Sequence, residues 1–192
     1  AGSEPVTVGL VAGSAASSVG YREELSTQRP RMVRFVPASV LGGLTGAGLL
    51  LVIGALNSPL GTIATEYLVL FHLLQNVIIS DWAPPLLILG LTPAMRTAVA
   101  ARGGGWFATV TRPVVAFPVW IVGWYVVHLG GVYDVALRNP ALLNVEHAFM
   151  IAIGLLFWWP VLADAPRSVP TLARIAYVFA AFVFSAFLGL AL

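Results

Sequence analysis

No charged side chain occurs in residues 35–65, which read FVPASVLGGLTGAGLLLVIGALNSPLGTIAT. A transmembrane helix needs roughly 20 mostly apolar residues to cross the hydrocarbon core of a bilayer. The stretch therefore predicts a membrane-spanning helix over residues 36–56. Asn57, Ser58 and Pro59 follow directly and are expected to end it, because proline does not continue a helix.

The whole chain is as poor in charge as this stretch. Of its 192 residues, 10 are Lys or Arg and 8 are Asp or Glu, which is 9%, whereas ordinary soluble domains have about 25%. Hydrophobic residues account for 59%, and the mean hydropathy is +0.91. This composition excludes a water-soluble enzyme, a nucleic-acid-binding domain and a disordered chain, and indicates an integral membrane protein. The absence of Cys excludes disulfides and thiolate metal sites.

Further apolar runs predict further spans. They must be helical, because they are too long and uninterrupted to be the strands of a barrel. Pro84 and Pro85 are expected to break or kink one of these helices just beyond its end, and residues 86–91 are apolar but too short to span. The additional predicted helices cover residues 62–81, 113–129, 140–163 and 171–192, and residues 6–20 are a shorter candidate.

The predicted fold class is an all-α, polytopic transmembrane helical bundle with five to six spans. It forms a single domain, residues 1–192, in which residues 1–34 hold the short first span and an Arg-rich loop and residues 35–192 form the core bundle. Gly42, Gly46 and Gly48 place small residues on the 36–56 helix, which predicts close packing against a neighbouring helix.

Every basic residue is an arginine, and basic residues favour the cytoplasmic side of a membrane. Arginines gather in or next to residues 21–35, 92–112 and 164–170, whereas residues 57–62 and 130–139 contain almost none. We therefore expect the first three loops to lie in the cytoplasm and the other two outside the plasma membrane. Within the 92–112 loop, the run Gly103 to Gly105 is expected to be flexible.

Ionisable residues inside spans are costly and need a reason. The predicted spans contain three histidines, His72, His128 and His147, on three different helices. His72 lies about ten residues, or roughly 15 Å, from the outer end of its predicted helix, and His147 about seven residues, or roughly 10 Å. His128 lies at the outer end of its helix, so all three are expected in the outer half of the membrane.

Other polar residues accompany the histidines. Gln75 and Asn76 share a helical face with His72, at i+3 and i+4. Glu146 precedes His147 and points about 100° away from it, so it can orient a neighbouring histidine or pair with an arginine. Glu66 is a further carboxylate in the predicted spans.

Three interpretations of the histidines remain open. Imidazole suits copper and zinc, so His72, His128 and His147 can form a metal site, with Met150 as a further thioether ligand and Gln75, Asn76 and Glu146 around it. Alternatively, His72 and His147 ligate a haem. The third interpretation is that each histidine only hydrogen-bonds a neighbouring helix.

Three stretches of sequence together resemble one known family. They are FHLLQNVIISDWAPPLLILGLTP (71–93), HLGGVYDVALRNPALLNVEHAFMIAIGLLFWWPVL (128–162) and RIAYVF (174–179). They are similar to the CtaG family of membrane-embedded assembly factors of caa-type cytochrome c oxidases. The resemblance covers about residues 35–192 and implies a role in delivering copper to the oxidase, with His72, His128 and His147 as the family's histidines and Glu146 beside the last.

The chain departs from the family pattern in two places. Family members usually carry a second histidine one turn after the first, and here that position is Asn76. An i, i+4 pair of histidines can chelate one metal ion from a single helix, whereas asparagine is a poor copper ligand. The family also usually has seven spans.

These observations lead to three functional hypotheses, none of them an enzyme. The first is a copper-binding factor in the plasma membrane that assists the assembly of a haem-copper cytochrome c oxidase. The second is a metal-free structural or accessory subunit of a larger respiratory complex that kept the fold but lost the site, which Asn76 favours. The third is a bis-histidine haem protein, which the resemblance disfavours.

Overall fold

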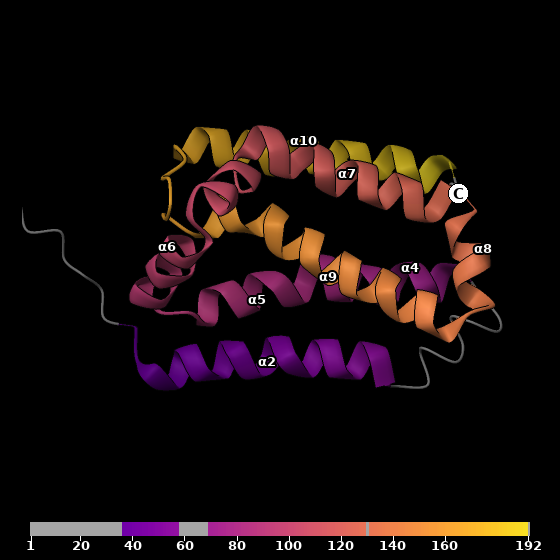
Figure 1. The fold of residues 1–192 in the computed structure, drawn as a ribbon, viewed down its shortest axis with the longest axis horizontal. Coiled ribbons are helices and arrows are strands. Elements are labelled where there is room, and N and C mark those ends of the chain that lie inside the picture. Colours follow the sequence, from indigo (N-terminus) through magenta and orange to yellow (C-terminus); the bar gives the residue numbers. More distant parts are fainter. Residues whose placement is uncertain (1–35, 58–68, 130, 192) are drawn as a thin grey trace, which may run out of the picture. The chain divides into compact units, whose positions relative to one another are not determined.

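The computed structural model describes residues 36–57, 69–129 and 131–191, and they belong to one compact unit (Figure 1). All regular structure within these residues is helical, which confirms the predicted fold class. The helices are α2 (Ala38–Asn57), α4 (Val69–Val77), the π-helix η1 (Ile78–Trp82), α5 (Ala83–Gly90), α6 (Pro93–Val110), α7 (Pro113–Leu129), α8 (Val132–Leu137), α9 (Pro140–Leu162) and α10 (Thr171–Ala191).

Four of the predicted helices are confirmed with small changes at their ends, namely α2, α7, α9 and α10. In the described residues, four helices are long and apolar enough to cross a membrane, or five if α6 and α7 together form one bent span. Five of the predicted spans fall wholly or partly within the described residues, which contain four to five. The sixth candidate, residues 6–20, lies outside the described residues, as does Glu66.

The predicted 62–81 helix is the largest correction. Residues 62–68 lie outside the described residues, and within them the span runs from Leu70 to Gly90 and continues through Pro84 and Pro85, which do not break it. The reason is the wide π-turn before them, where the N–H of Ala83 donates to the carbonyl of Ile78, five residues back. The two prolines then occupy the first turn of α5, where a missing N–H costs little. Residues 86–91, expected to be too short to span, therefore complete the span.

Glycines let two neighbouring helices approach the Leu70–Gly90 span. A Cβ added at Gly154 of α9 would lie 2.8 Å from the Cα of Ser80, so α9 packs directly on the backbone of η1. A Cβ at Gly48 of α2 would lie 2.9 Å from the side chain of Leu87, so α2 packs closely on α5. Gly42 and Gly46 have no atom within 4 Å of that position in the described part of the chain, so only Gly48 confirms the predicted packing role.

The prediction of a loop over residues 92–112 is also wrong, because most of these residues form the helix α6. The Thr92 side chain accepts a hydrogen bond from the Met95 N–H at 3.1 Å, and Pro93 opens the first turn. This N-cap and proline pair is a helix-start signal that was readable in the sequence. Gly104 has a positive φ of 54° and kinks α6, so the glycine run is a kink inside a helix. A bend of 73° then separates α6 from α7.

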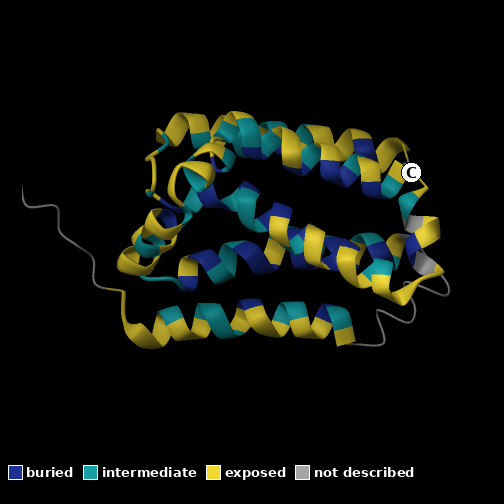
Figure 2. Ribbon diagram, in the orientation of Figure 1, coloured by how far each residue is buried: buried dark blue, intermediate teal, exposed yellow. Residues whose placement is uncertain are grey.

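The unit has two distinct ends in Figure 1. The kinked α6 and the connection from α9 to α10 lie at one end, and α8 lies at the other. Figure 2 shows the buried residues where α4, α5, α7 and α9 face one another, whereas α2 and α10 turn many exposed residues outward. Large apolar side chains such as Leu50 (70% exposed) and Phe182 (71% exposed) stand on these outer faces, as lipid contact requires.

Candidate functional site

The three histidines lie together in the structure, although they come from three helices. The ring centroid of His72 on α4 lies 5.7 Å from that of His128 on α7 and 6.3 Å from that of His147 on α9. His128 is the last residue but one of α7, and α7 leads directly toward α8. The cluster therefore lies toward the α8 end of the unit, away from α6.

Asn76 lies at the centre of this arrangement. It follows His72 by one helical turn, so both side chains leave the same face of the helix. Its Nδ2 atom lies 3.0 Å from Nε2 of His72 and 3.4 Å from Nε2 of His128, and it donates a hydrogen bond of 3.0 Å to Oε1 of Glu146. We refer to His72, Asn76, His128, Glu146 and His147 as the histidine cluster.

Glu146 supplies the charge of the cluster. Its Oε1 atom lies 3.0 Å from Nε2 of His72, and both side chains are buried. A buried carboxylate needs such partners, because taking an isolated charge out of water is costly. The sequence predicted that Glu146 would hydrogen-bond a neighbouring histidine or pair with an arginine, and the first alternative is the one that the structure has.

The ring of His128 is held in one orientation. Its Nδ1–H donates to the carbonyl of Trp124 at 2.8 Å, because a carbonyl can only accept. The ring also stacks on the Trp124 indole, with centroids 5.0 Å apart and planes 14° apart. In the neutral ring, Nε2 therefore carries the lone pair, and this atom faces Asn76.

Three buried polar atoms of the cluster have no hydrogen-bond partner in the part of the chain that the structure describes. They are Oδ1 of Asn76, Oε2 of Glu146 and Nε2 of His147. Buried polar atoms are nearly always paired, so each such atom needs an explanation, and an absent ion or water is among the usual ones. These three atoms are the ones in the cluster that a bound ion or a water molecule would satisfy.

Two further predicted residues, Gln75 and Met150, have contacts of their own. Gln75 donates to the carbonyl of Ala55 at 3.0 Å and so ties α4 to α2 instead of joining the histidines. Met150 is completely buried in the apolar core that also contains Ile79 and Trp124. No hydrogen bond or ring contact among the described residues connects Met150 to the histidine cluster.

Asp81 is a residue that the sequence analysis missed. It was placed at the end of the predicted 62–81 helix, but it lies near the middle of the Leu70–Gly90 span. It lines a cavity of about 210 Å³ together with Trp124 and Ser185. An acidic residue in the middle of a span marks a functional position by default, and a correct span boundary would have revealed it.

The spacing of the donor atoms can be compared with that of a metal site. Two ligand atoms bound at about 2.0 Å to one tetrahedral ion lie about 3.3 Å apart. The separation of 3.0 Å between Nε2 of His72 and Oε1 of Glu146 is close to this value. However, within the described residues no three His, Asp or Glu side chains converge as closely as a bound ion requires. The amide nitrogen of Asn76 occupies the point at which they would meet.

Comparisons with known proteins identify the family. Residues 44–192 match the profile of the family described as cytochrome c oxidase caa3 assembly factor (CtaG). An uncharacterized protein of Mycobacterium leprae is 30% identical over 145 residues, and uncharacterized proteins of Mycobacterium bovis and Mycobacterium tuberculosis are 26% identical over 144 residues. Each match covers 63% of this chain and 21% of the relative, so the chain spans about a fifth of the length of these proteins. No solved structure matches the chain.

The family profile covers most of the chain and includes every residue of the histidine cluster. The resemblance noted from the three sequence stretches is thereby confirmed. This chain belongs to the family of cytochrome c oxidase caa3 assembly factors, CtaG.

Proposed function

We propose that this chain is a membrane-embedded assembly factor of a haem-copper cytochrome c oxidase, and that its histidine cluster holds copper on the way to that partner. One observation carries the proposal. Nε2 of His72 and Oε1 of Glu146 lie around a single atom, the amide nitrogen of Asn76, each 3.0 Å from it, and Nε2 of His128 lies 3.4 Å from it. Imidazole nitrogen with a carboxylate oxygen is a donor set that suits Cu(II).

In this proposal, Asn76 takes the place of the ion when none is bound. Its NH2 group has two hydrogens, of which one donates to Glu146 and the other lies toward Nε2 of His128. Nε2–H of His72 also donates to Glu146, so the buried carboxylate has two donors. When copper enters, the Asn76 side chain leaves this point, because an amide flip alone would only put Oδ1 where Nδ2 now lies. His147 then supplies a further ligand, because its Nε2 atom is also buried without a described partner.

The other two hypotheses lead to different expectations. A haem iron on Nε2 of His72 would need its macrocycle where Asn76 and Glu146 already lie, each 3.0 Å from that atom, so haem is the least favoured. A metal-free accessory subunit is the second candidate. The described residues do not form a site with three metal ligands, and Asn76 already hydrogen-bonds Glu146 at the centre of the histidine cluster. Both alternatives are decided by the metal content of the protein.

We further propose that the histidine cluster faces the outside of the plasma membrane. In the described part of the chain, Arg138 alone accompanies α8, whereas five arginines lie on α6, on α10 or in the connections at the opposite end. These five are Arg96, Arg102, Arg112, Arg167 and Arg174. Because basic residues favour the cytoplasmic side, the end with these five arginines faces the cytoplasm. The α8 end, which holds the histidine cluster, then faces outward.

The test is the number of copper and iron atoms per chain in the purified, copper-loaded protein, measured by elemental analysis. We expect about one copper per chain in the wild type and loss of most of it in His72→Ala, His128→Ala and His147→Ala. Gln75→Ala is the matched control, because Gln75 is buried on the same helix but bonds to α2, and it should keep its copper.

A second variant tests the role of Asn76. Asn76→His restores a histidine pair at i and i+4 on one helix face and should raise the affinity for copper. Full copper in His72→Ala and His147→Ala would refute the site. No copper in the wild type after loading would favour the metal-free subunit, and a Soret band with one iron per chain would favour haem.

A further inference from the structure

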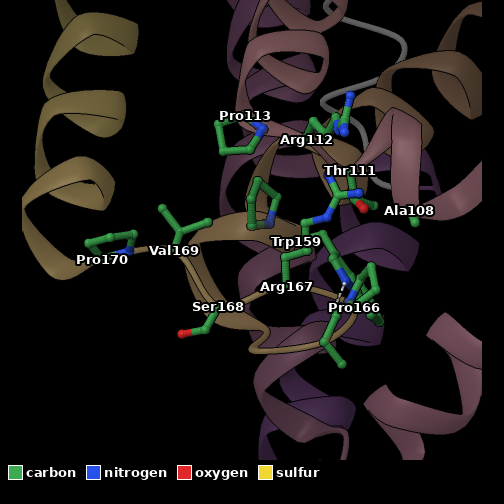
Figure 3. Close-up of a pocket in the computed structure, with 12 residues that line it drawn as sticks. Ala108, Thr111, Arg112, Pro113, Trp159, Pro166, Arg167, Ser168, Val169 and Pro170 are labelled. Carbon is green, nitrogen blue, oxygen red and sulfur yellow. Dashed lines mark hydrogen bonds between the residues drawn. The ribbon is translucent and has the colours of Figure 1, made fainter.

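A small pocket lies at the end of the unit opposite the histidine cluster. It has a volume of about 150 Å³ and opens where α6 turns into α7 and where α9 connects to α10 (Figure 3). Arg112, Arg167 and Ser168 are among the residues that line it, and Trp159 and Pro113 form apolar walls. We call it the arginine pocket.

The connection that forms one wall is held in place by other side chains. Arg174 donates to the carbonyls of Val161 at 2.9 Å and Val169 at 2.8 Å, and it also pairs with Asp164 at 2.6 Å. The indole N–H of Trp159 donates to the carbonyl of Ala165 at 2.7 Å. The wall therefore has a defined shape before any ligand arrives.

Arg96 takes part in the same bracing. Its guanidinium donates to the carbonyl of Leu162 at 2.8 Å and to that of Leu91 at 3.2 Å. Arg96 and Arg174 are thus occupied by groups of the protein itself. They fix the end of α9 and leave the charge of the other arginines available.

Arg112 and Arg167 are different. Both are exposed, and within the described ranges neither has a hydrogen bond from its side chain or an ion pair. Asp164 is the one described carboxylate near them, and its oxygen is already bonded to Arg174 and Ser168. Two permanent positive charges therefore stand at one pocket without a counter-charge from the described chain.

The helices that begin at the pocket add to its positive potential. Pro113 opens α7, and Pro170 precedes α10, and both residues line the pocket. Neither helix has an acidic residue in its first turn. The partial positive charge of two helix N-termini thus adds to the charges of the two arginines.

We propose that the arginine pocket binds the phosphate group of an anionic ligand at the membrane surface, either the headgroup of an anionic phospholipid or free phosphate. Guanidinium groups match phosphate oxygens with two parallel hydrogen bonds. Basic pockets between transmembrane helices are a known type of site for anionic headgroups. The apolar walls suit the start of an acyl chain.

The test uses delipidated protein in detergent, with native mass spectrometry to count bound ligands. The probes are phosphatidylglycerol, phosphatidylcholine and inorganic phosphate. We expect the wild type to prefer phosphatidylglycerol over phosphatidylcholine by about twenty-five-fold, the product of about fivefold for each of the two arginines. The double variant R112Q/R167Q should lose the preference, and the single variants should each lose about fivefold.

Arg138→Gln is the control, because Arg138 is an exposed arginine at the opposite end of the unit. It should leave the preference unchanged. Binding of inorganic phosphate that disappears in R112Q/R167Q would support the pocket with free phosphate as the source. An equal preference for phosphatidylglycerol in the wild type and the double variant, with no loss of phosphate binding, would overturn the proposal. Copper content is measured in parallel and should not change, so this outcome is independent of the histidine cluster.

Discussion

The contact between Gly154 of α9 and Ser80 of η1 gives a quantitative prediction for Gly154→Ala. An added Cβ would lie 2.8 Å from both the Cα and the carbonyl carbon of Ser80, whereas ordinary contacts begin at 3.4 Å. The obstructing atoms are backbone, so the two helices must separate by at least about 0.6 Å.

The energy of this change can be worked from its two parts. Overpacking of this kind costs about 1–3 kcal/mol. Alanine in a helix recovers about 0.5–1 kcal/mol relative to glycine. Because the obstructing atoms are backbone, the overpacking lies in the upper part of its range, about 2–3 kcal/mol, so the net loss is about 1–2.5 kcal/mol. This loss should lower the thermal midpoint by about 2–10 °C for a chain of this size.

The assay is thermal unfolding in detergent followed by intrinsic fluorescence, because the chain has six Trp and Trp120 and Trp124 are buried in the core. Gly43→Ala is the matched control, because a Cβ there meets no atom of the described residues within 4 Å. Its midpoint should stay level or rise by a few degrees, because alanine is the better helix former. A Gly154→Ala midpoint equal to or above that of the wild type would refute the close packing of α9 on η1.

Further changes follow from the two ends of the unit. Glu146→Gln removes the buried charge beside His72 and should weaken copper binding at least about tenfold. Unchanged copper binding would contradict the role of Glu146 in the site. Arg174→Gln removes the donors to two carbonyls and should cost about 2 kcal/mol of unfolding free energy, measured by denaturant titration. The hydrogen bond from Arg174 lowers the pKa of Asp164, so its small contribution to stability is complete above about pH 5 and is lost as the pH falls below about 4. Asp164→Asn should therefore differ from the wild type above pH 5 and converge with it in acid, and a constant difference would contradict this assignment.

Part of the histidine cluster could be predicted from spacing alone. His72 and Asn76 share a helix face by periodicity, and the three histidines were expected on three different helices in the outer half of the membrane. Which atoms meet could not be predicted, because Gln75 lies on nearly the same face and instead bonds to α2. Met150 follows His147 by three residues and is buried in the core that contains Trp124, and its role as a thioether ligand stays a prediction.

The sequence by itself determined the class of the protein and most of its spans. In lipid, every backbone N–H and C=O group of a helix must be hydrogen-bonded within that helix. A long apolar run therefore predicts a spanning helix without knowledge of its neighbours. Tertiary structure decided what happens where segments meet. The π-turn carries the span through Pro84 and Pro85, and Gly154 brings α9 onto η1. The meeting of His72, Asn76 and Glu146 depends on how side chains from separate helices interlock, which no single run of sequence contains.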